Sequence, residues 1–269
     1  MRVLTMNVFA HHREWEARRP ILVDGMSRMA PDIALLQEIL VTDGYDQARD
    51  ILGEAFAYHH QAGRSADGVG ATVASRWPMT VVLETSLDDG DDSWIGSLVV
   101  ARVQCPDPIG TTFVAHHKPT WLPAGERERE RQAVRAAREI DRLVDSERLP
   151  VVMAGDLDAP PEAASIRFLT GRQSLDGMSV SYHDAWAVTH SSEPGHTFSP
   201  ANGIRSDRWR PRAGERIDYI MVRGGEHGAP LDVVHCEVAF DHPVDGVWAS
   251  DHFAVVADLE AAPETGDHP

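Results

Sequence analysis

A carboxylate and an imidazole, Asp251 and His252, stand directly before the last apolar run of the chain, residues 253–257. An acid beside an imidazole at the mouth of a buried strand lies where a sheet enzyme presents its catalytic groups. Further polar side chains follow or interrupt earlier apolar runs, and they are Asn7, Glu38, His117, Asp156, Asp158 and Asp218. One polar residue at a strand end is common. Its recurrence along the whole chain predicts one site built from the ends of several strands.

Hydrophobic periodicity predicts the elements that position these side chains. Helical spacing of apolar residues predicts helices over residues 19–29, 46–56 and 126–144. Runs rich in β-branched residues predict strands at 3–8, 33–37, 69–75, 79–84, 97–104, 111–116, 150–154, 216–222, 231–239 and 253–259. Many strands with few helices between them are typical of two packed sheets flanked by helices. We expect a single domain over residues 1–260 and a flexible tail over 261–269.

The composition narrows the classes of partner. The 269 residues include 25 basic and 42 acidic side chains, a formal net charge of −17. Nucleic-acid binding depends on neutralising several phosphates, so this charge favours a small phosphorylated substrate and makes nucleic acid the second choice. No apolar run approaches the roughly 20 residues that span a bilayer. Cys105 and Cys236 show no metal-binding spacing, so we expect reduced thiols and a cytoplasmic location, with the oligomeric state left open.

The order of the polar clusters identifies a family resemblance. The clusters follow one another in the order Asn, Gln-Glu, His, Gly-Asp-x-Asp, Arg-Ile-Asp-Tyr and Ser-Asp-His. This order resembles that of the endonuclease/exonuclease/phosphatase superfamily, the DNase I-like metal-dependent phosphoesterases. The resemblance runs from Arg2 to about Leu259. The resemblance also includes the segment 195–198, Gly-His-Thr-Phe. It implies an α/β fold, a four-layer αββα sandwich of two packed mixed β-sheets flanked by helices, and a metal-dependent hydrolase acting on phosphate ester bonds.

Hydrolysis of an anionic ester needs a cation on the phosphoryl oxygens, because negative charge repels the nucleophile. Hard ions such as Mg²⁺ take oxygen ligands. We therefore expect Mg²⁺, or Mn²⁺, with Glu38 as the first ligand. The resemblance implies that Asn7 and Asp251 complete or orient the metal shell, and that Asn7 also belongs to the catalytic group.

The resemblance further implies the roles of the remaining polar residues. Asp156 corresponds to the base or water-orienting carboxylate. His252, matched with Asp218, corresponds to the imidazole that meets the phosphate, and His117 to a second phosphate-facing imidazole. Candidate substrate contacts are Lys118, Arg76 and Trp121.

Asp158 departs from the family pattern, which usually has Asn at this position. An ionised Asp has no hydrogen to donate and repels a phosphate oxygen. Three explanations are open: a cation lies between Asp158 and the phosphate, the carboxyl is protonated, or the substrate differs from the family norm. We favour an ordinary phosphoesterase that tolerates the change.

The sequence contains three adjacent histidine pairs, residues 11–12, 59–60 and 116–117. These pairs suggest a second interpretation, a transition-metal site with histidine ligands. Neighbours on a strand point to opposite faces, so at most one of each pair can reach a common centre. If histidines do gather, Mn²⁺, Fe²⁺ or Zn²⁺ would replace Mg²⁺. The preferred function is hydrolysis of a small-molecule, sugar or lipid phosphate mono- or diester. The alternatives are a DNA or RNA endo- or exonuclease, a repurposed metalloenzyme of specialised metabolism, and a binding protein that has lost catalysis.

Overall fold

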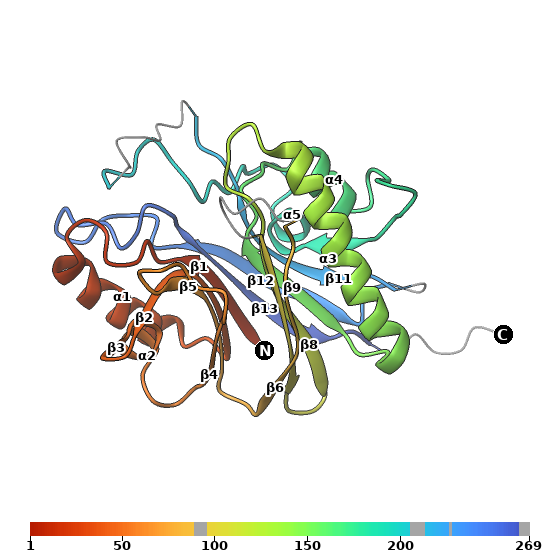
Figure 1. Ribbon diagram of the computed structural model, residues 1–269, viewed down its shortest axis with the longest axis horizontal. Coiled ribbons are helices and arrows are strands. Elements are labelled where there is room, and N and C mark those ends of the chain that lie inside the picture. Colours follow the sequence, from red (N-terminus) through yellow and green to blue (C-terminus); the bar gives the residue numbers. More distant parts are fainter. Residues whose placement is uncertain (89–95, 205–212, 226–227, 264–269) are drawn as a thin grey trace.

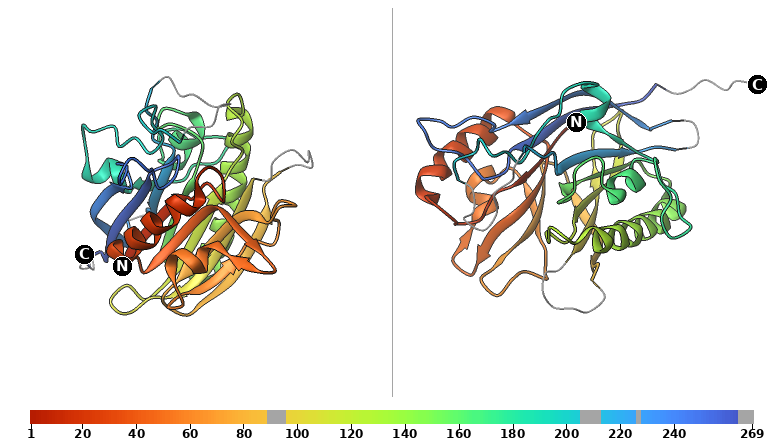
Figure 2. Two further views of the ribbon diagram at one scale, coloured as in Figure 1. Left: turned by 90° about the vertical axis from the view of Figure 1, so that its left-hand side faces the viewer. Right: turned by 90° about the horizontal axis from the view of Figure 1, so that it is seen from above.

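Two β-sheets pack face to face and helices cover their outer surfaces (Figures 1 and 2). The computed structural model describes residues 1–88, 96–204, 213–225 and 228–263. The first sheet has the order β12 (Leu231–Ala239), β13 (Ala254–Ala261), β1 (Arg2–Asn7), β2 (Ile33–Thr42), β5 (Val69–Ser75) and β4 (Ala57–His60), with β3 (Tyr45–Asp46) paired to β2. The second sheet has the order β10 (Tyr182–Asp184), β11 (Asp218–Arg223), β9 (Val151–Asp156), β8 (Thr111–Lys118), β7 (Ser97–Gln104) and β6 (Met79–Ser86).

The helices complete the layers. The first sheet packs on α1 (Trp15–Met29) and α2 (Gln47–Leu52), and the second on α3 (Glu126–Glu147) and α4 (Ala164–Leu169), while α5 (Ala185–Thr189) follows β10. Three hydrophobic clusters fill the spaces between neighbouring layers, one between the sheets and one under each helical layer. Parallel pairs β1/β2 and β8/β9 make both sheets mixed. The predicted four-layer sandwich is confirmed.

Several element boundaries differ from the predictions; β2, for example, was predicted to end at residue 37 and runs to Thr42. α1 begins at Trp15, four residues early, because the indole is buried against the first sheet. The second predicted helix stops at Leu52, where Gly53 takes φ 82°, and residues 57–60 form the unpredicted strand β4. The last strand continues through Ala261, which pairs with Leu231, so the ordered domain extends past residue 260. Residues 264–269 of the predicted tail lie outside the described residues.

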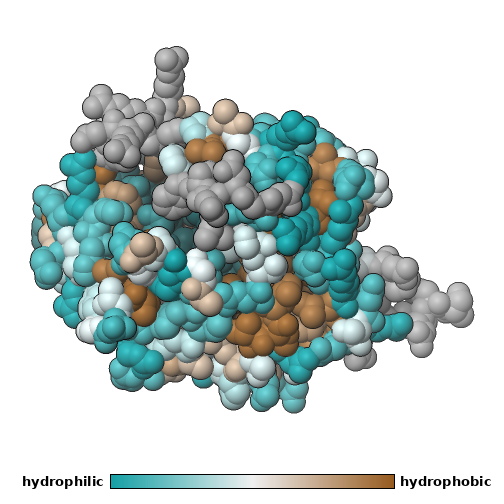
Figure 3. All heavy atoms as spheres, in the orientation of Figure 1, coloured by the Kyte–Doolittle hydropathy of each residue, from teal (hydrophilic) through white to brown (hydrophobic). Residues whose placement is uncertain are grey.

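Polar side chains dominate the face of the molecule in Figure 3, and the two cysteines lie inside the protein. The face shown in Figure 3 is mostly hydrophilic, with hydrophobic side chains gathered in a few places. Cys105 and Cys236 are both buried and unpaired. Across the described ranges, we find no helix with the length and apolar character needed to cross a membrane.

Candidate active site

The strand pairings bring the predicted polar residues to one edge of the sandwich, the side at which β1 and β9 end and β11 and β13 begin. Asn7 ends β1 and lies beside Gln37 of the parallel strand β2, so Glu38 follows at the same level. Asp251 and His252 precede β13, which runs antiparallel to β1 and therefore starts at this edge. In the second sheet, Asp218 at the start of β11 pairs with Asp156 at the end of β9.

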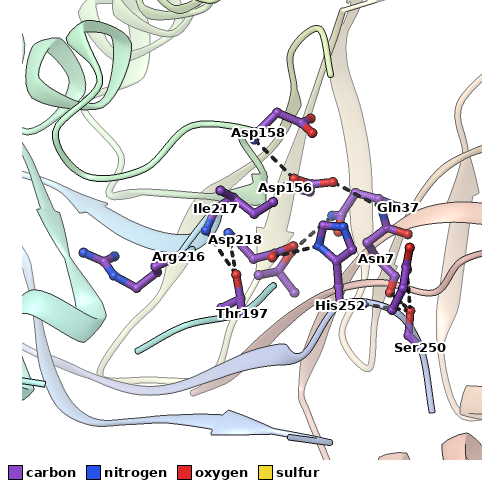
Figure 4. Close-up of polar contacts among 12 residues, drawn as sticks. Asn7, Gln37, Asp156, Asp158, Thr197, Arg216, Ile217, Asp218, Ser250 and His252 are labelled. Atoms are coloured by element: carbon purple, nitrogen blue, oxygen red, sulfur yellow. Dashed lines mark hydrogen bonds and ion pairs between the residues drawn. The ribbon is translucent and has the colours of Figure 1, made fainter. Parts of the chain in front are cut away.

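Three polar contacts join the two sheets at this edge. The first contact is the Asn7 side-chain amide, which donates to Asp156 Oδ2 at 3.1 Å. The same amide also donates within the first sheet, to Glu38 Oε1 at 3.0 Å. His252 Nδ1 lies 3.0 Å from Asp218 Oδ2, so the predicted imidazole–carboxylate pair is present (Figure 4). The third contact joins the Gln37 amide to His116 Nε2 at 2.9 Å. All these side chains except Glu38 are buried.

Lys118 is held between two carboxylates of the second sheet. Its ammonium lies 2.7 Å from Asp156 Oδ2 and also donates to Asp158 Oδ2. It is the only lysine in a sequence with 24 arginines. Of the three explanations left open for Asp158, the structure fits a neighbouring cation, and this cation is a side chain of the protein itself. Asp158 takes a left-handed conformation, φ 50°, which Asp and Asn tolerate better than most residues.

The pKa values of Asp158, Asp156 and His252 are shifted in different directions because their charged neighbours differ. Burial and the neighbouring Asp156 raise the pKa of Asp158 to about 7. Burial opposes ionisation of Asp156 as well, but Lys118 and His252 outweigh it and lower the Asp156 pKa to about 2. Burial likewise disfavours charge on His252, yet Asp218 and Asp156 raise its pKa well above the ordinary value. The site therefore holds an imidazolium and an ammonium beside an ionised Asp156.

The first-sheet carboxylates have no paired ammonium of this kind among the described residues. Within the described part of the chain, neither Glu38 nor Asp251 forms an ion pair with a lysine or arginine. Burial raises the pKa of Asp251 to about 7; the positive charges of His252 and Arg18 oppose this rise, and the charges of Glu38 and Asp156 add to it. In the second sheet, Asp218 Oδ1 is also buried, and none of the described residues forms a hydrogen bond with it.

These oxygen donors fit a hard divalent cation, which would neutralise crowded carboxylates. Glu38, Asp251 and the Asn7 amide oxygen are the predicted ligands. A second group of potential ligands is Asp156, Asp218 and His252, whose donor atoms lie within 4.8 Å of one another. Lys118 and the Asp218–His252 hydrogen bond already occupy part of that second group.

The structure does not bring every predicted residue to the site. Alternate residues of β8 face opposite sides: His116 and Lys118 point between the sheets, and His117 lies on the helix-facing side, with Nδ1 3.3 Å from the Ser97 carbonyl. His117 therefore faces away from the side of β8 that carries Lys118, contrary to its predicted phosphate-facing role, and burial lowers its pKa to about 4.

Arg76 is also absent from this edge. It follows β5, which runs antiparallel to β2, so Arg76 lies near Asp32 at the opposite end of the sheet. Its guanidinium donates to the Pro31 carbonyl and stacks over Phe56. Trp121 lies three residues beyond Lys118 and is 41% exposed, and its substrate contact stays a prediction.

Several supporting residues were not predicted. The Thr197 hydroxyl accepts hydrogen bonds from the backbone amides of Ile217 and Asp218, which fixes the carboxylate under His252 (Figure 4). Gly155 lets β9 approach β8, because a Cβ there would lie 2.0 Å from the His117 carbonyl oxygen. Arg18 is buried behind the site, although in the sequence it looks like any helix-surface arginine. Only Thr197 and Gly155 belonged to segments with a family-like signal.

Comparison with known proteins agrees with this arrangement. The chain matches the endonuclease/exonuclease/phosphatase family over residues 4–252 and belongs to it. Members of this family hydrolyse phosphoester bonds and in general depend on a divalent metal ion, so the predicted reaction class is confirmed. No protein with a curated description matches the sequence.

Solved structures share the fold at low identity. One is D. rerio TDP2 complexed with a single-strand DNA product, with TM-score 0.75, 18% identity and coverage of 97% of this chain and 99% of that chain. The Bacteroides thetaiotaomicron mannosyl-6-phosphatase Bt3783 has TM-score 0.71 and 16% identity, covering 97% and 99%. The human Nocturnin catalytic domain with bound sulfate has TM-score 0.69 and 16% identity, covering 97% and 94%.

Proposed function

We propose that the chain hydrolyses a phosphate mono- or diester of a small organic molecule, such as a sugar or lipid phosphate. The supporting observation is the sole lysine, Lys118, paired with Asp156 and Asp158 beside the Asp218–His252 pair. One ammonium and one imidazolium suit a single phosphate group, whereas a nucleic-acid strand needs a longer row of cations. We further propose a cytoplasmic location.

In this proposal Glu38, Asp251 and the Asn7 amide oxygen hold Mg²⁺ or Mn²⁺, which would polarise the phosphoryl oxygens and offset their charge. The protonated His252, oriented by Asp218, and Lys118 donate hydrogen bonds to those oxygens. Trp121 forms a wall for the leaving group.

Asp156 orients the attacking water. The water oxygen bonds to phosphorus and the ester P–O bond breaks. The water releases its proton to solvent, and the leaving oxygen takes a proton from solvent. Three donors reach this carboxylate, from Asn7, Lys118 and the Asp158 amide, so it is a weak base. We assign it to positioning water more than to removing its proton.

The test is parallel turnover of p-nitrophenyl phosphate, bis-p-nitrophenyl phosphate and plasmid DNA, after elemental analysis of the bound metal. We expect Mg²⁺- or Mn²⁺-dependent turnover of at least one nitrophenyl ester, lost with EDTA. Cleavage of DNA together with inert nitrophenyl esters would contradict the small-substrate proposal. Inert esters and inert DNA at every metal tested would contradict the hydrolase itself.

A nuclease is the second candidate because a groove lies along α3. The groove has a volume of about 520 Å³ and is lined by four arginines, Arg127, Arg131, Arg135 and Arg138. Acidic side chains offset this row, since Glu130 also lines the groove, Arg131 pairs with Glu128 and Arg138 pairs with Asp176. The row of arginines is thus partly neutralised, which weakens the case for a nuclease.

The histidine pairs give little support to a repurposed metalloenzyme. His59 lies 2.7 Å from Glu84, and His60 lies 3.0 Å from Asp46, both on β4 at the edge of the first sheet. Among the residues that the structure describes, the one group of three or more potential metal ligands contains a single histidine, His252. An oxygen-rich site favours Mg²⁺ or Mn²⁺.

A further inference from the structure

A buried arginine lies behind the first-sheet side of the site and has no part in the chemistry described above. Arg18 has no exposed surface. Its guanidinium contacts six backbone carbonyl oxygens at 2.7–3.2 Å, those of Val8, Phe9, Ala10, His12, Arg13 and Ala249. A guanidinium has five N–H groups, so at least one is shared between two carbonyls.

Five of these carbonyls belong to the loop that leaves β1 directly after Asn7. Phe9, Ala10, Arg13 and Glu14 in this loop have φ between 38° and 62°. Residues other than glycine rarely adopt this left-handed region, and such conformations persist only where the surroundings impose them. The contacts of Arg18 with successive carbonyls impose the conformation of this loop.

The sixth carbonyl connects the loop to the other side of the cation site. Ala249 lies two residues before Asp251, and Arg18 Nη1 bonds both its carbonyl and that of Val8, at 2.8 and 2.9 Å. The next residue, Ser250, donates from its hydroxyl to the Asn7 carbonyl at 2.7 Å. The backbone beside Asn7 and the backbone beside Asp251 are thus tied together through one guanidinium.

We propose that Arg18 is a positioning residue for the divalent-cation site, which holds Asn7 and Asp251 so that their oxygens converge with Glu38. The inference rests on the proposed function for the identity of that site. A lysine cannot fully replace Arg18, because an ammonium offers three donors from one atom and the guanidinium offers five in a planar fork. Burial lowers the pKa of Arg18 to about 10, so the side chain stays charged at neutral pH.

The test compares Arg18→Met and Arg18→Lys with Arg19→Met as the matched control, since Arg19 is the next residue of α1 but is exposed and pairs with Asp50. Mn²⁺ affinity is measured by direct titration, and amide exchange in residues 8–13 by mass spectrometry on metal-free protein. For Arg18→Met we expect about 10-fold weaker Mn²⁺ binding or more, together with faster exchange in this loop. Arg18→Lys should lie between Arg18→Met and wild type, and Arg19→Met should match wild type.

Turnover supplies a further readout. At saturating Mn²⁺, Arg18→Met should lower kcat with KM changed less than about 3-fold, because Arg18 does not contact the substrate. Wild-type Mn²⁺ affinity and kcat in a folded but less thermostable Arg18→Met would overturn the proposal and leave a purely structural role. If Arg18→Met does not fold, Arg18→Lys decides, with unchanged Mn²⁺ affinity overturning the proposal. A wild-type protein that binds Mn²⁺ but hydrolyses no phosphate ester would refute the proposed function alone.

Discussion

The two sheets contribute halves of the site that differ in electrostatic state. The second sheet supplies Asp156 and Asp158 with their own cation, Lys118, already between them. The first sheet supplies Glu38 and Asp251, which form no ion pair with a lysine or arginine among the described residues. Burial raises one carboxyl pKa to about 7 in each half, that of Asp158 and that of Asp251, so the halves differ in the paired ammonium and not in this shift. The comparison indicates that an added divalent cation gains most on the first-sheet side, where no lysine or arginine of the described residues forms an ion pair with the carboxylates.

In the proposed function, the phosphate lies where contacts join the two halves. Asn7 of the first sheet donates to Asp156 of the second, and His252, which precedes β13 of the first, pairs with Asp218 of the second. A phosphate bound between the halves would meet a cation from each side. Removing charge from the two sides should therefore have different consequences, which the following variants separate.

The largest effect is expected on the first-sheet side. Glu38→Gln removes an anionic ligand that an amide cannot replace, so we expect at least about 100-fold weaker Mn²⁺ binding and near-complete loss of turnover. Calorimetric titration with Mn²⁺ and steady-state kinetics measure both, and exposed Glu54→Gln is the control. Wild-type activity at limiting metal would remove Glu38 from the ligand set.

The bridging pair comes next. His252→Ala and Asp218→Ala should each lower kcat by about 100-fold or more, and the double variant should lose little beyond either single one, because the carboxylate acts through the imidazole that it orients. The four rates of this double-mutant cycle at saturating metal provide the measurement. Losses that multiply fully would show that the two residues act independently.

On the second-sheet side, Lys118→Met leaves Asp156 and Asp158 as adjacent carboxylates without their cation. We expect about a 100-fold loss of kcat/KM for a phosphate ester, with part of it recovered in Lys118→Met/Asp158→Asn. Asp158→Asn alone should change kcat by less than about 3-fold, because an amide can still contact Lys118 and donates to phosphate. A loss of 10-fold or more in Asp158→Asn that excess metal does not rescue would contradict the ordinary-phosphoesterase reading.

The sequence predicted the strand-end residues and the fold well, because buried strands leave strong apolar runs and the family order of polar residues is specific. Asp218 with His252 was predictable for this reason. The choice between His116 and His117 was not, since it depends on which face of β8 each occupies. Nor was the role of Arg18, because its six partners are backbone carbonyls, and five of them lie in a loop whose left-handed conformations have no glycine signature.

The smallest expected effect concerns stability without metal. The Asp251 carboxyl has its pKa raised from 3.8 to about 7, so between pH 4 and 7 the folded protein binds more protons there than the unfolded chain does, and this residue destabilises the fold increasingly as pH rises. Buried His116 and His117, with pKa values lowered to about 3 and about 4, act in the opposite sense over this range.

The overall Tm is therefore a poor readout, and the difference between Asp251→Asn and wild type isolates the carboxylate. In EDTA we expect this Tm difference to favour the variant by about 5 °C more at pH 7 than at pH 5. Saturating Mg²⁺ should reverse it, because wild type then gains a ligand charge that the amide lacks. Thermal unfolding at both pH values, with and without Mg²⁺, provides the measurement. A difference independent of pH in EDTA would show that Asp251 is already compensated, and the contrast between the two halves of the site would lose its basis.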